Sequence, residues 1–328
     1  MDILNGKQLR QQAAQRLDYA AYNPKMLTLI HGGVLLAGSF IIILLNLLLD
    51  HFIKDTGGLS GIGTRNILET VSSLASLAYT FAAPFWQVGV VFAFLCVARK
   101  QYADGHSLLR GFGRIGSVLA MLLLEFGLYI ALAIGVSYVA TFLAMPFCDD
   151  LMTLMMPVMT ALEQDPSADM YALIMQLPAM QLLDAALPLL IIFSVLYLAL
   201  GVFFFYRLRF APYIVLDEYR MGGFASLRLS FRMTKGHCIS LFKLDLGFWK
   251  YYLLLMLVSC ISLAGDWLPQ LGAPAPFNAY WFSLLLYGIY AAAALLLDWH
   301  MRPMVETTYA LAYDKIKNPP LAVVDQMR

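Results

Sequence analysis

Three polar side chains interrupt long apolar runs of the sequence, where a charged or amide group is costly. Glu125 lies well inside one run, Gln87 follows Pro84 in another, and Asp298 lies near the end of a third. Polar groups held in an apolar environment mark ion pathways, ligand sites or hydrogen bonds between helices. We therefore predict an intramembrane polar site at Glu125, Gln87 and Asp298. A hydrogen bond between helices stays open for Glu125, and a side chain reaching the membrane surface for Asp298.

Basic side chains gather in two further segments. The first begins an apolar run with the pattern G-x-G-x-x-G at 111–116; without a strand before it, it is not a dinucleotide site, but a helix N-terminus can hold a lipid phosphate. The second, 223–236, has a helical period with an apolar stripe at Ala225, Leu229 and Met233 beside a basic stripe. We expect this helix to lie at the inner membrane surface and Gly236 to end it in a left-handed conformation. The candidate residues for binding a lipid headgroup or another anion are Arg110, Arg114, Arg228, Arg232 and Lys235. Membrane anchoring alone and docking of a partner protein stay open.

Other chemistry has weak support in the sequence. The metalloprotease motif H-E-x-x-H, the hydrolase motif G-x-S-x-G and the Walker A motif are not present. The four cysteines are scattered, and the four methionines in 152–159 fit either a Cu(I) site or one apolar helix face. We predict no enzymatic activity, no cofactor and no metal site.

The elements that position these residues follow from composition. Of the 328 residues, 61% are hydrophobic and 13% are charged, against roughly 45–50% and 25% in soluble domains. About 20 apolar residues span a bilayer, and six segments suffice: 27–52, 70–98, 115–145, 185–206, 244–264 and 280–300. We predict an all-α polytopic membrane protein of about six transmembrane helices, with interfacial amphipathic helices. The net charge of +1 gives no reason to expect a nucleic-acid partner.

The basic residues set the predicted orientation. Every Lys and Arg except Lys54 and Arg65 falls on one side of the six segments, and the positive-inside rule makes that side cytoplasmic. We divide the chain into a cytoplasmic amphipathic segment 1–26, a membrane domain 27–317 and a cytoplasmic tail 318–328. The membrane domain includes an acidic outer loop 146–184 and a cytoplasmic hairpin 206–243. In the outer loop, Asp165 and Pro166 predict the start of a short interfacial helix.

The hairpin carries a motif. Its residues 230–237, SFRMTKGH, followed by Leu241 and Phe242, resemble the S-x-x-M-M-K-G-H…L-F signature of a bacterial membrane family catalogued as domain of unknown function 975. That family is distantly similar to the membrane domain of glycerophosphodiester phosphodiesterases. Further similar positions are Leu9, Arg10, Ala13, Leu17, Gly89, Ala98, Arg99, Tyr213, Asp217, Pro303, Thr308 and Tyr313. The sequence departs from the family at Thr234 and Cys238. The resemblance implies a bacterial six-helix membrane protein and no established activity.

These observations lead to three hypotheses about function. The first is a non-enzymatic integral membrane protein that binds or translocates a lipid or amphiphile, in envelope homeostasis or peptide resistance. The second is an accessory or scaffold subunit of a membrane complex, with a membrane protein partner. The third is a secondary transporter that uses Glu125. In each case we expect a multi-pass protein of the bacterial cytoplasmic membrane, with both termini cytoplasmic and anionic lipids on the cytoplasmic side.

Overall fold

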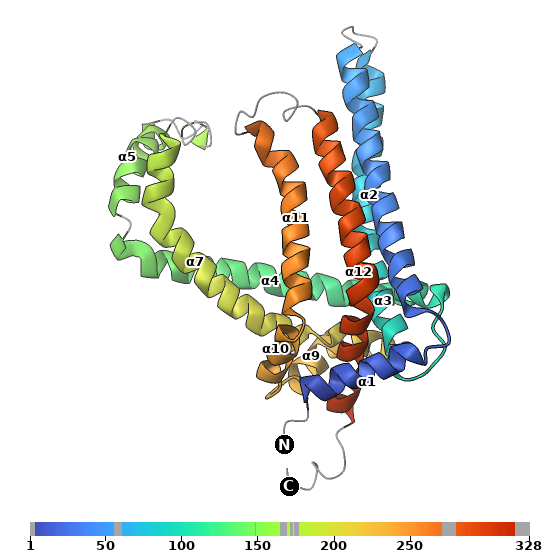
Figure 1. Cartoon of the computed structure of the whole chain (residues 1–328). Helices are drawn as coiled ribbons and strands as arrows, with labels where there is room; N and C mark the ends of the chain where they lie inside the picture. The colour runs from blue at the N-terminus through green and yellow to red at the C-terminus, as the bar shows by residue number, and fades with distance from the viewer. Residues whose placement is uncertain are drawn as a thin grey trace. The chain divides into compact units, whose positions relative to one another are not determined.

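The chain folds into helices joined by short connections (Figure 1). A computed structural model describes residues 4–55, 61–147, 149–164, 169, 170, 173, 177–270 and 280–318. The described residues contain no β-strand, so the predicted all-α class is confirmed. Asp165, Pro166 and residues 319–328 of the predicted tail lie outside the described residues.

Long apolar helices dominate the structure. In chain order the elements are α1 (Gly6–Asp18), α2 (Pro24–Asp55), α3 (Gly61–Ala98), the 3₁₀ helix η1 (Gly105–Arg114), α4 (Ile115–Ala144), the 3₁₀ turn η2 (Met145–Phe147), α5 (Asp149–Gln164), α7 (Ala179–Leu208), α8 (Ala211–Asp217), α9 (Gly223–Met233), α10 (Cys238–Leu246), α11 (Trp249–Gln270) and α12 (Tyr280–Lys317). Runs of Leu, Ala, Ile and Phe make these segments good helix formers in an apolar solvent, because a helix satisfies every backbone polar group internally. Pro84 lies inside α3, which continues past it.

Five helical segments in the described part of the chain are long and apolar enough to cross a membrane. They are Pro24–Asn46, Glu69–Ala98, Gly105–Ala144, Asp184–Asp217 and Leu284–Lys317. Helices α10 and α11 pass the same test as a pair bent by 67°. The chain is therefore a multi-pass membrane protein, and the prediction of about six spans is confirmed at five or six.

The chain divides into two compact units. Unit 1 comprises Met1–Leu122 and Leu208–Arg328, and unit 2 comprises Leu123–Arg207. The boundaries fall inside α4 and at the end of α7, so the predicted membrane domain 27–317 consists of two units. The candidate residue Glu125 belongs to unit 2, whereas Gln87 and Asp298 belong to unit 1.

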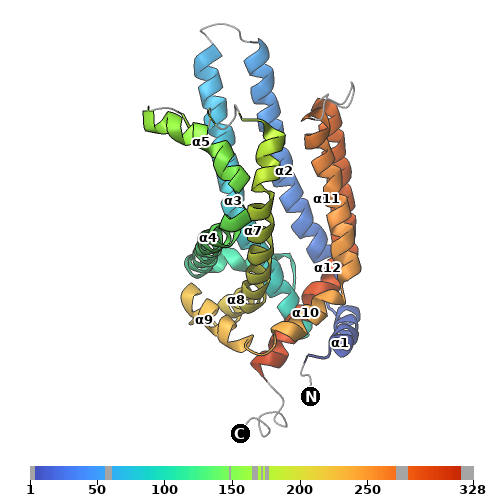
Figure 2. The ribbon, with the colours of Figure 1, turned by 90° about the vertical axis from the view of Figure 1, so that its left-hand side faces the viewer.

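Unit 1 is packed most tightly at one end. There α2 and α3 lie side by side, α11 lies along α12, and α1 lies against α12, α3 and α10 (Figures 1 and 2). We call this the basic end, because Arg99, Arg209 and Lys317 lie in it. Its core side chains include Leu27, Phe94, Leu108, Met121, Val215 and Leu241. Farther along the helices, large apolar side chains such as Phe40, Leu74 and Leu257 are exposed, as lipid-facing surfaces require.

Two glycines permit the closest backbone contact in this core. A Cβ added at Gly89 would lie 1.8 Å from the carbonyl oxygen of Leu108, and one added at Gly111 would lie 2.1 Å from that of Phe85. Only a residue without a side chain fits where η1 presses on α3. Of the three glycines in the 111–116 pattern, Gly111 thus serves helix packing, whereas a Cβ at Gly113 or Gly116 would meet nothing within 4 Å.

The two predicted amphipathic helices are present. In the N-terminal segment, α1 begins after Asn5, whose side chain accepts from the backbone N–H of Lys7 and Gln8, and it buries Leu9 and Ala13. In the hairpin, α9 is followed by Gly236 with a φ of +84°, as predicted.

One face of α9 packs against the protein. It carries Ser226, Ser230 and Thr234, all fully buried, and the Ser230 hydroxyl accepts from the backbone N–H of Phe210 at 3.2 Å. In contrast, Ala225 is exposed and Leu229 is half-buried. Small hydroxylated side chains let α9 approach α8 closely, which leaves the apolar stripe for lipid.

The glycine contacts predict a sharp difference between two neighbouring positions. Gly111→Ala should destabilise the protein by about 1–3 kcal/mol, because overpacking forces α3 and η1 apart. Gly113→Ala is the matched control, since a Cβ there meets nothing within 4 Å. Thermal unfolding in mild detergent measures both variants. Equal melting temperatures for the two would contradict this account of the contact.

Candidate functional site

Polar side chains form a stripe along one face of α12. Asp298, Arg302, Glu306, Tyr309, Tyr313 and Lys317 follow one another at intervals of three or four residues. At 3.6 residues per turn these positions share one face. From Asp298 to Lys317 the stripe covers about 29 Å of α12 at 1.5 Å per residue, and it ends at the basic end of unit 1.

Arg302 is the centre of the first cluster on this stripe. Its Nη1 donates to Asp298 Oδ2 at 3.0 Å, its Nε to Glu306 Oε1 at 3.4 Å, and its Nη2 to Gln87 Oε1 at 2.8 Å. The Tyr251 hydroxyl donates to Asp298 Oδ1 at 2.7 Å. The Arg302 side chain is 13% exposed. The structure therefore brings Gln87 and Asp298, two of the three predicted intramembrane residues, into one network joining α3, α11 and α12.

A buried histidine lies beside this network. His31 of α2 is fully buried, and its ring stacks on Trp86 of α3 with centroids 6.4 Å apart and planes 8° apart. Gln87 and Arg302 lie within electrostatic reach of the ring. Within the described residues neither ring nitrogen makes a hydrogen bond of normal geometry. The imidazole thus adds an unsatisfied polar group to the same depth of the bundle.

A cavity of about 240 Å³ opens next to the Arg302 cluster. Its walls come from α2, α3 and α12, and they include Leu35, Ser39, Tyr79, Tyr287, Tyr290, Ala294 and Leu295. Asp298 lines the same cavity at the end nearest the basic end. The Ser39 hydroxyl donates to the Tyr79 oxygen at 3.0 Å, and Tyr79 donates to the carbonyl of Leu35 at 3.2 Å. The cavity therefore has apolar and aromatic walls and a carboxylate at one end.

A second cavity, of about 370 Å³, adjoins the first. Its lining consists of Leu36, Ala37, Phe40, Leu284, Tyr287, Gly288 and Ala291. Leu36, Tyr287 and Ala291 line both cavities. The pair extends along α2 and α12 with an apolar lining, away from Asp298. A long molecule with an apolar tail and one polar end matches this shape.

Two further polar clusters lie toward the basic end. In one, Asp245 accepts from the hydroxyls of Tyr309 and of Tyr252, the latter at 2.8 Å, and the Arg209 guanidinium lies 4.0 Å from the centroid of the Tyr309 ring. The other is centred on Arg99, which bonds both carboxylate oxygens of Asp217 and both of Asp314.

The Arg99 cluster joins the ends of three helices. The hydrogen bonds that Arg99 donates to Asp217 raise the pKa of Arg99. Lys317 and Tyr313 donate to Asp217 at 2.7 and 2.9 Å. Arg99 follows α3, Asp217 ends α8, and Asp314 lies near the end of α12. This network holds α3, α8 and α12 together, and α3 and α12 also carry residues of the Arg302 cluster.

The other predicted residues are not members of the Arg302 cluster. Glu125 lies in unit 2, half-buried, one helical turn before Tyr129. Arg110 is exposed, with its guanidinium 5.7 Å from the centre of the Phe92 ring. The exposed cations of α9 and the turn after it are Arg228, Arg232 and Lys235.

Arg114 has a structural role. Its Nη1 donates to the carbonyls of Val215 and Glu218, the latter at 3.0 Å, and its Nη2 donates to those of Tyr219 at 2.6 Å and Met221 at 2.9 Å. These carbonyls lie at and just beyond the end of α8, where helix carbonyls lack partners. The structure thus uses Arg114 as a helix cap in place of the predicted anion site.

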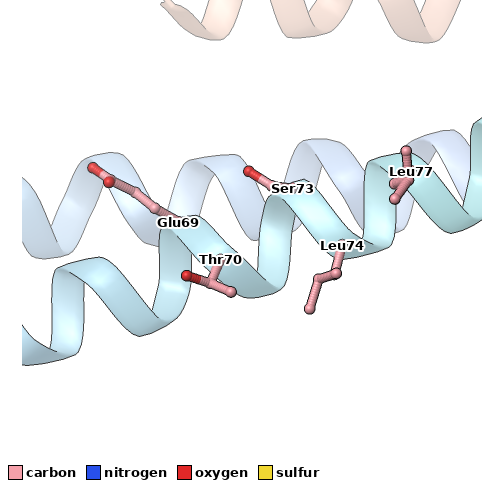
Figure 3. A pocket seen from close by; sticks show the side chains of 5 residues that line it. All are labelled: Glu69, Thr70, Ser73, Leu74 and Leu77. Atoms are coloured by element: carbon pink, nitrogen blue, oxygen red, sulfur yellow. The ribbon is translucent and has the colours of Figure 1, made fainter.

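A broad depression on α3 is too open to be a site. Its volume is about 590 Å³, and its described lining is Glu69, Thr70, Ser73, Leu74 and Leu77, all from one helix (Figure 3). Figure 3 shows Glu69 and Ser73 pointing to one side of the helix and Thr70 and Leu74 to the other. These side chains do not converge on one point.

The candidate site includes residues that were not among the predicted site residues, and the sequence contains a pattern that indicates some of them. The intervals of three and four between the polar residues of 298–317 mark one face of a helix. That pattern identifies Arg302, Glu306 and Tyr309 as neighbours. It gives no information on Tyr251 or His31, because their contacts depend on how α11 and α2 pack against α12.

The Arg302 cluster makes a prediction about stability. Arg302→Gln should destabilise the protein by about 3–5 kcal/mol, because it leaves the carboxylates of Asp298 and Glu306 partly buried without their cation. Adding Asp298→Asn and Glu306→Gln should recover part of that loss. Thermal unfolding in detergent compares the single and triple variants. A triple variant less stable than Arg302→Gln would show that charge pairing is not the cause.

Comparisons with known proteins add nothing to this geometry. No family model matches the chain, and neither a curated protein nor a solved structure matches it. The similarity to the family of unknown function 975 therefore stays a prediction. The candidate site rests on the chain's own residues: the paired cavities between α2, α3 and α12, ended by Asp298 and the Arg302 cluster.

Proposed function

We propose that this protein binds an amphiphile, a lipid or lipid-like molecule, within the membrane, without catalysing a reaction on it. The carrying observation is the pair of adjoining cavities along α2 and α12, apolar over most of their lining and ended by Asp298. Small-molecule sites are mostly apolar pockets of roughly 300–1,000 Å³ with a few convergent polar groups. Taken together, the two cavities reach that size.

The position of the cavities supports this proposal. They lie between helices whose outer surfaces expose Phe40, Leu285 and Leu296, so lipid reaches their walls directly. The apolar lining gives an acyl chain an apolar protein surface to pack against. Asp298, held by Arg302 and Tyr251, offers the polar end a fixed partner.

The exposed surface of α9 and α10 supports contact with anionic headgroups. Arg228, Arg232 and Lys235 are exposed there, as are the large apolar side chains Phe224 and Ile239. Cations beside apolar side chains are typical of helices that lie in the headgroup region. We propose that this surface faces the cytoplasmic leaflet of a bacterial membrane, with both chain termini on that side.

Two other functions have less support. A partner protein could cover the surface of α9 and α10, but its mixture of cations and apolar side chains suits a lipid surface at least as well. For transport by way of Glu125, the structure adds no observation beyond a half-buried carboxyl side chain. Amphiphile binding uses the features that unit 1 brings together.

Blocking the cavity tests the proposed function. A photoreactive dodecyl probe with an uncharged diol head, added to the protein in nanodiscs, should label peptides of α2 and α12. Ala294→Phe should lower this labelling at least fivefold, because the phenyl ring occupies the cavity that Ala294 lines. Ala292→Phe is the matched control, because Ala292 is exposed and does not line the cavity. Equal labelling of both variants and the wild type would refute the site.

The basic surface gives a separate prediction. Arg228→Ala combined with Arg232→Ala should weaken binding to vesicles rich in phosphatidylglycerol about 30-fold, since each cation near an anionic surface contributes about 1 kcal/mol. A peptide of residues 220–237, prepared with and without both changes, allows the measurement in a vesicle sedimentation assay. Lysine at both positions should restore most of the affinity. Equal vesicle affinity of the peptides with and without both substitutions would contradict the proposed contact with anionic headgroups.

A further inference from the structure

We propose that the amphiphile of this cavity carries a cationic head, a primary amine or quaternary ammonium group, which binds against Asp298. This inference rests on the proposed function and names the chemical class of its ligand. Free cationic amphiphiles and membrane lipids with an amine head share this chemistry.

The charge of the cavity lining carries the proposal. Among the described lining residues, Asp298 is the one acidic side chain, and the described lining contains no Lys, Arg or His. The remaining polar groups of the lining are the hydroxyls of Ser39, Tyr79, Tyr287 and Tyr290. Arg302 bonds Asp298 but does not line the cavity. A head that enters therefore meets a carboxylate, without a cation beside it in the wall.

The balance of charge around Asp298 points the same way. Arg302 is shared between Asp298 and Glu306, and Arg209 lies within electrostatic reach of Glu306 and of Asp245, so two guanidinium groups face three carboxylates. The other partners in the cluster, Gln87 and Tyr251, are neutral. The cluster has an excess of one negative charge, which a bound cation would neutralise in an environment where an uncompensated charge is costly.

Asp298 also keeps capacity for a further donor. A carboxylate accepts about four hydrogen bonds, and the structure gives one to each oxygen, from Tyr251 and from Arg302. A primary ammonium group could donate to the remaining lone pairs from inside the cavity, whereas a quaternary ammonium group, which has no N–H, would be attracted by its charge alone. A sulfate or phosphodiester head is an anion without a donor and would be repelled.

Aromatic side chains line the cavity farther from Asp298. Tyr287 and Tyr290 line it from α12, and Tyr79 lines it from α3. At 1.5 Å per residue, Tyr290 and Tyr287 lie about 12 and 17 Å from Asp298 along α12, so their rings flank the tail of a ligand whose head is at the carboxylate. An alkyl tail of the same molecule then follows the apolar lining toward Phe40 and Leu284.

Competition among three amphiphiles with the same dodecyl tail tests the proposal. Dodecyltrimethylammonium, dodecyl sulfate and dodecyl maltoside each compete with the uncharged photoreactive probe in nanodiscs. The ammonium compound should displace the probe at a concentration at least tenfold below that of the sulfate. Asp298→Asn should abolish this preference while the probe still labels the cavity, and Asp298→Glu should retain it.

A control separates the local effect from the overall charge. Glu218→Gln removes one carboxylate at the basic end, away from the cavity lining, and should leave the tenfold preference unchanged. Equal displacement by the three heads, or a preference that survives Asp298→Asn, would overturn the cationic head and leave amphiphile binding standing. Failure of the probe to label the cavity in the wild type would refute the proposed function itself.

Discussion

The interior of this protein is organised by the need to pair charges inside an apolar bundle. α12 carries polar side chains at intervals of three and four residues, and an unpaired one at membrane depth would cost several kcal/mol. Each cluster on the stripe therefore recruits another helix: Gln87 from α3 and Tyr251 from α11 at Arg302 and Asp298, and Asp217 from α8 near Lys317. These bonds set how the helices of unit 1 pack.

The cavity lies where this packing ends. At the basic end the core is dense, and glycines let η1 press against α3. Beyond Asp298 the facing positions of α2 and α12 carry small residues such as Ala37, Gly288 and Ala291, which leave space between the helices. The carboxylate of Asp298 is therefore both the end of the polar stripe and part of the cavity lining. The group that needs a partner inside the helix bundle is also the group that a ligand in the cavity would meet.

Part of this site follows from sequence alone. Gln87 and Asp298 are recognisable because a polar side chain in an apolar run is costly, and Gly236 because a left-handed turn suits glycine. The Arg99 pair with Asp217 spans 118 residues, a separation at which local patterns say nothing. The family resemblance includes Arg99 and Asp217 among its similar positions, but it does not indicate that the two side chains form a pair.

The prediction for α9 concerned its position at the membrane surface and did not say which face meets the protein. Ser226, Ser230 and Thr234 have weak hydropathy, so periodicity favours the apolar stripe as the buried one. In a membrane protein lipid covers apolar side chains, and small hydroxylated residues pack helices together. Hydropathy therefore finds the helix but does not show which of its faces packs against the protein.

The most direct test of the account is native mass spectrometry of the full chain extracted gently from the membrane in which it is made. We expect one retained small molecule with an alkyl tail and an amine or ammonium head, lost in Ala294→Phe and kept in Ala292→Phe. Two results would contradict a ligand site between α2 and α12. One is a mass spectrum without any bound small molecule in every mild detergent, and the other is a bound small molecule that remains in Ala294→Phe.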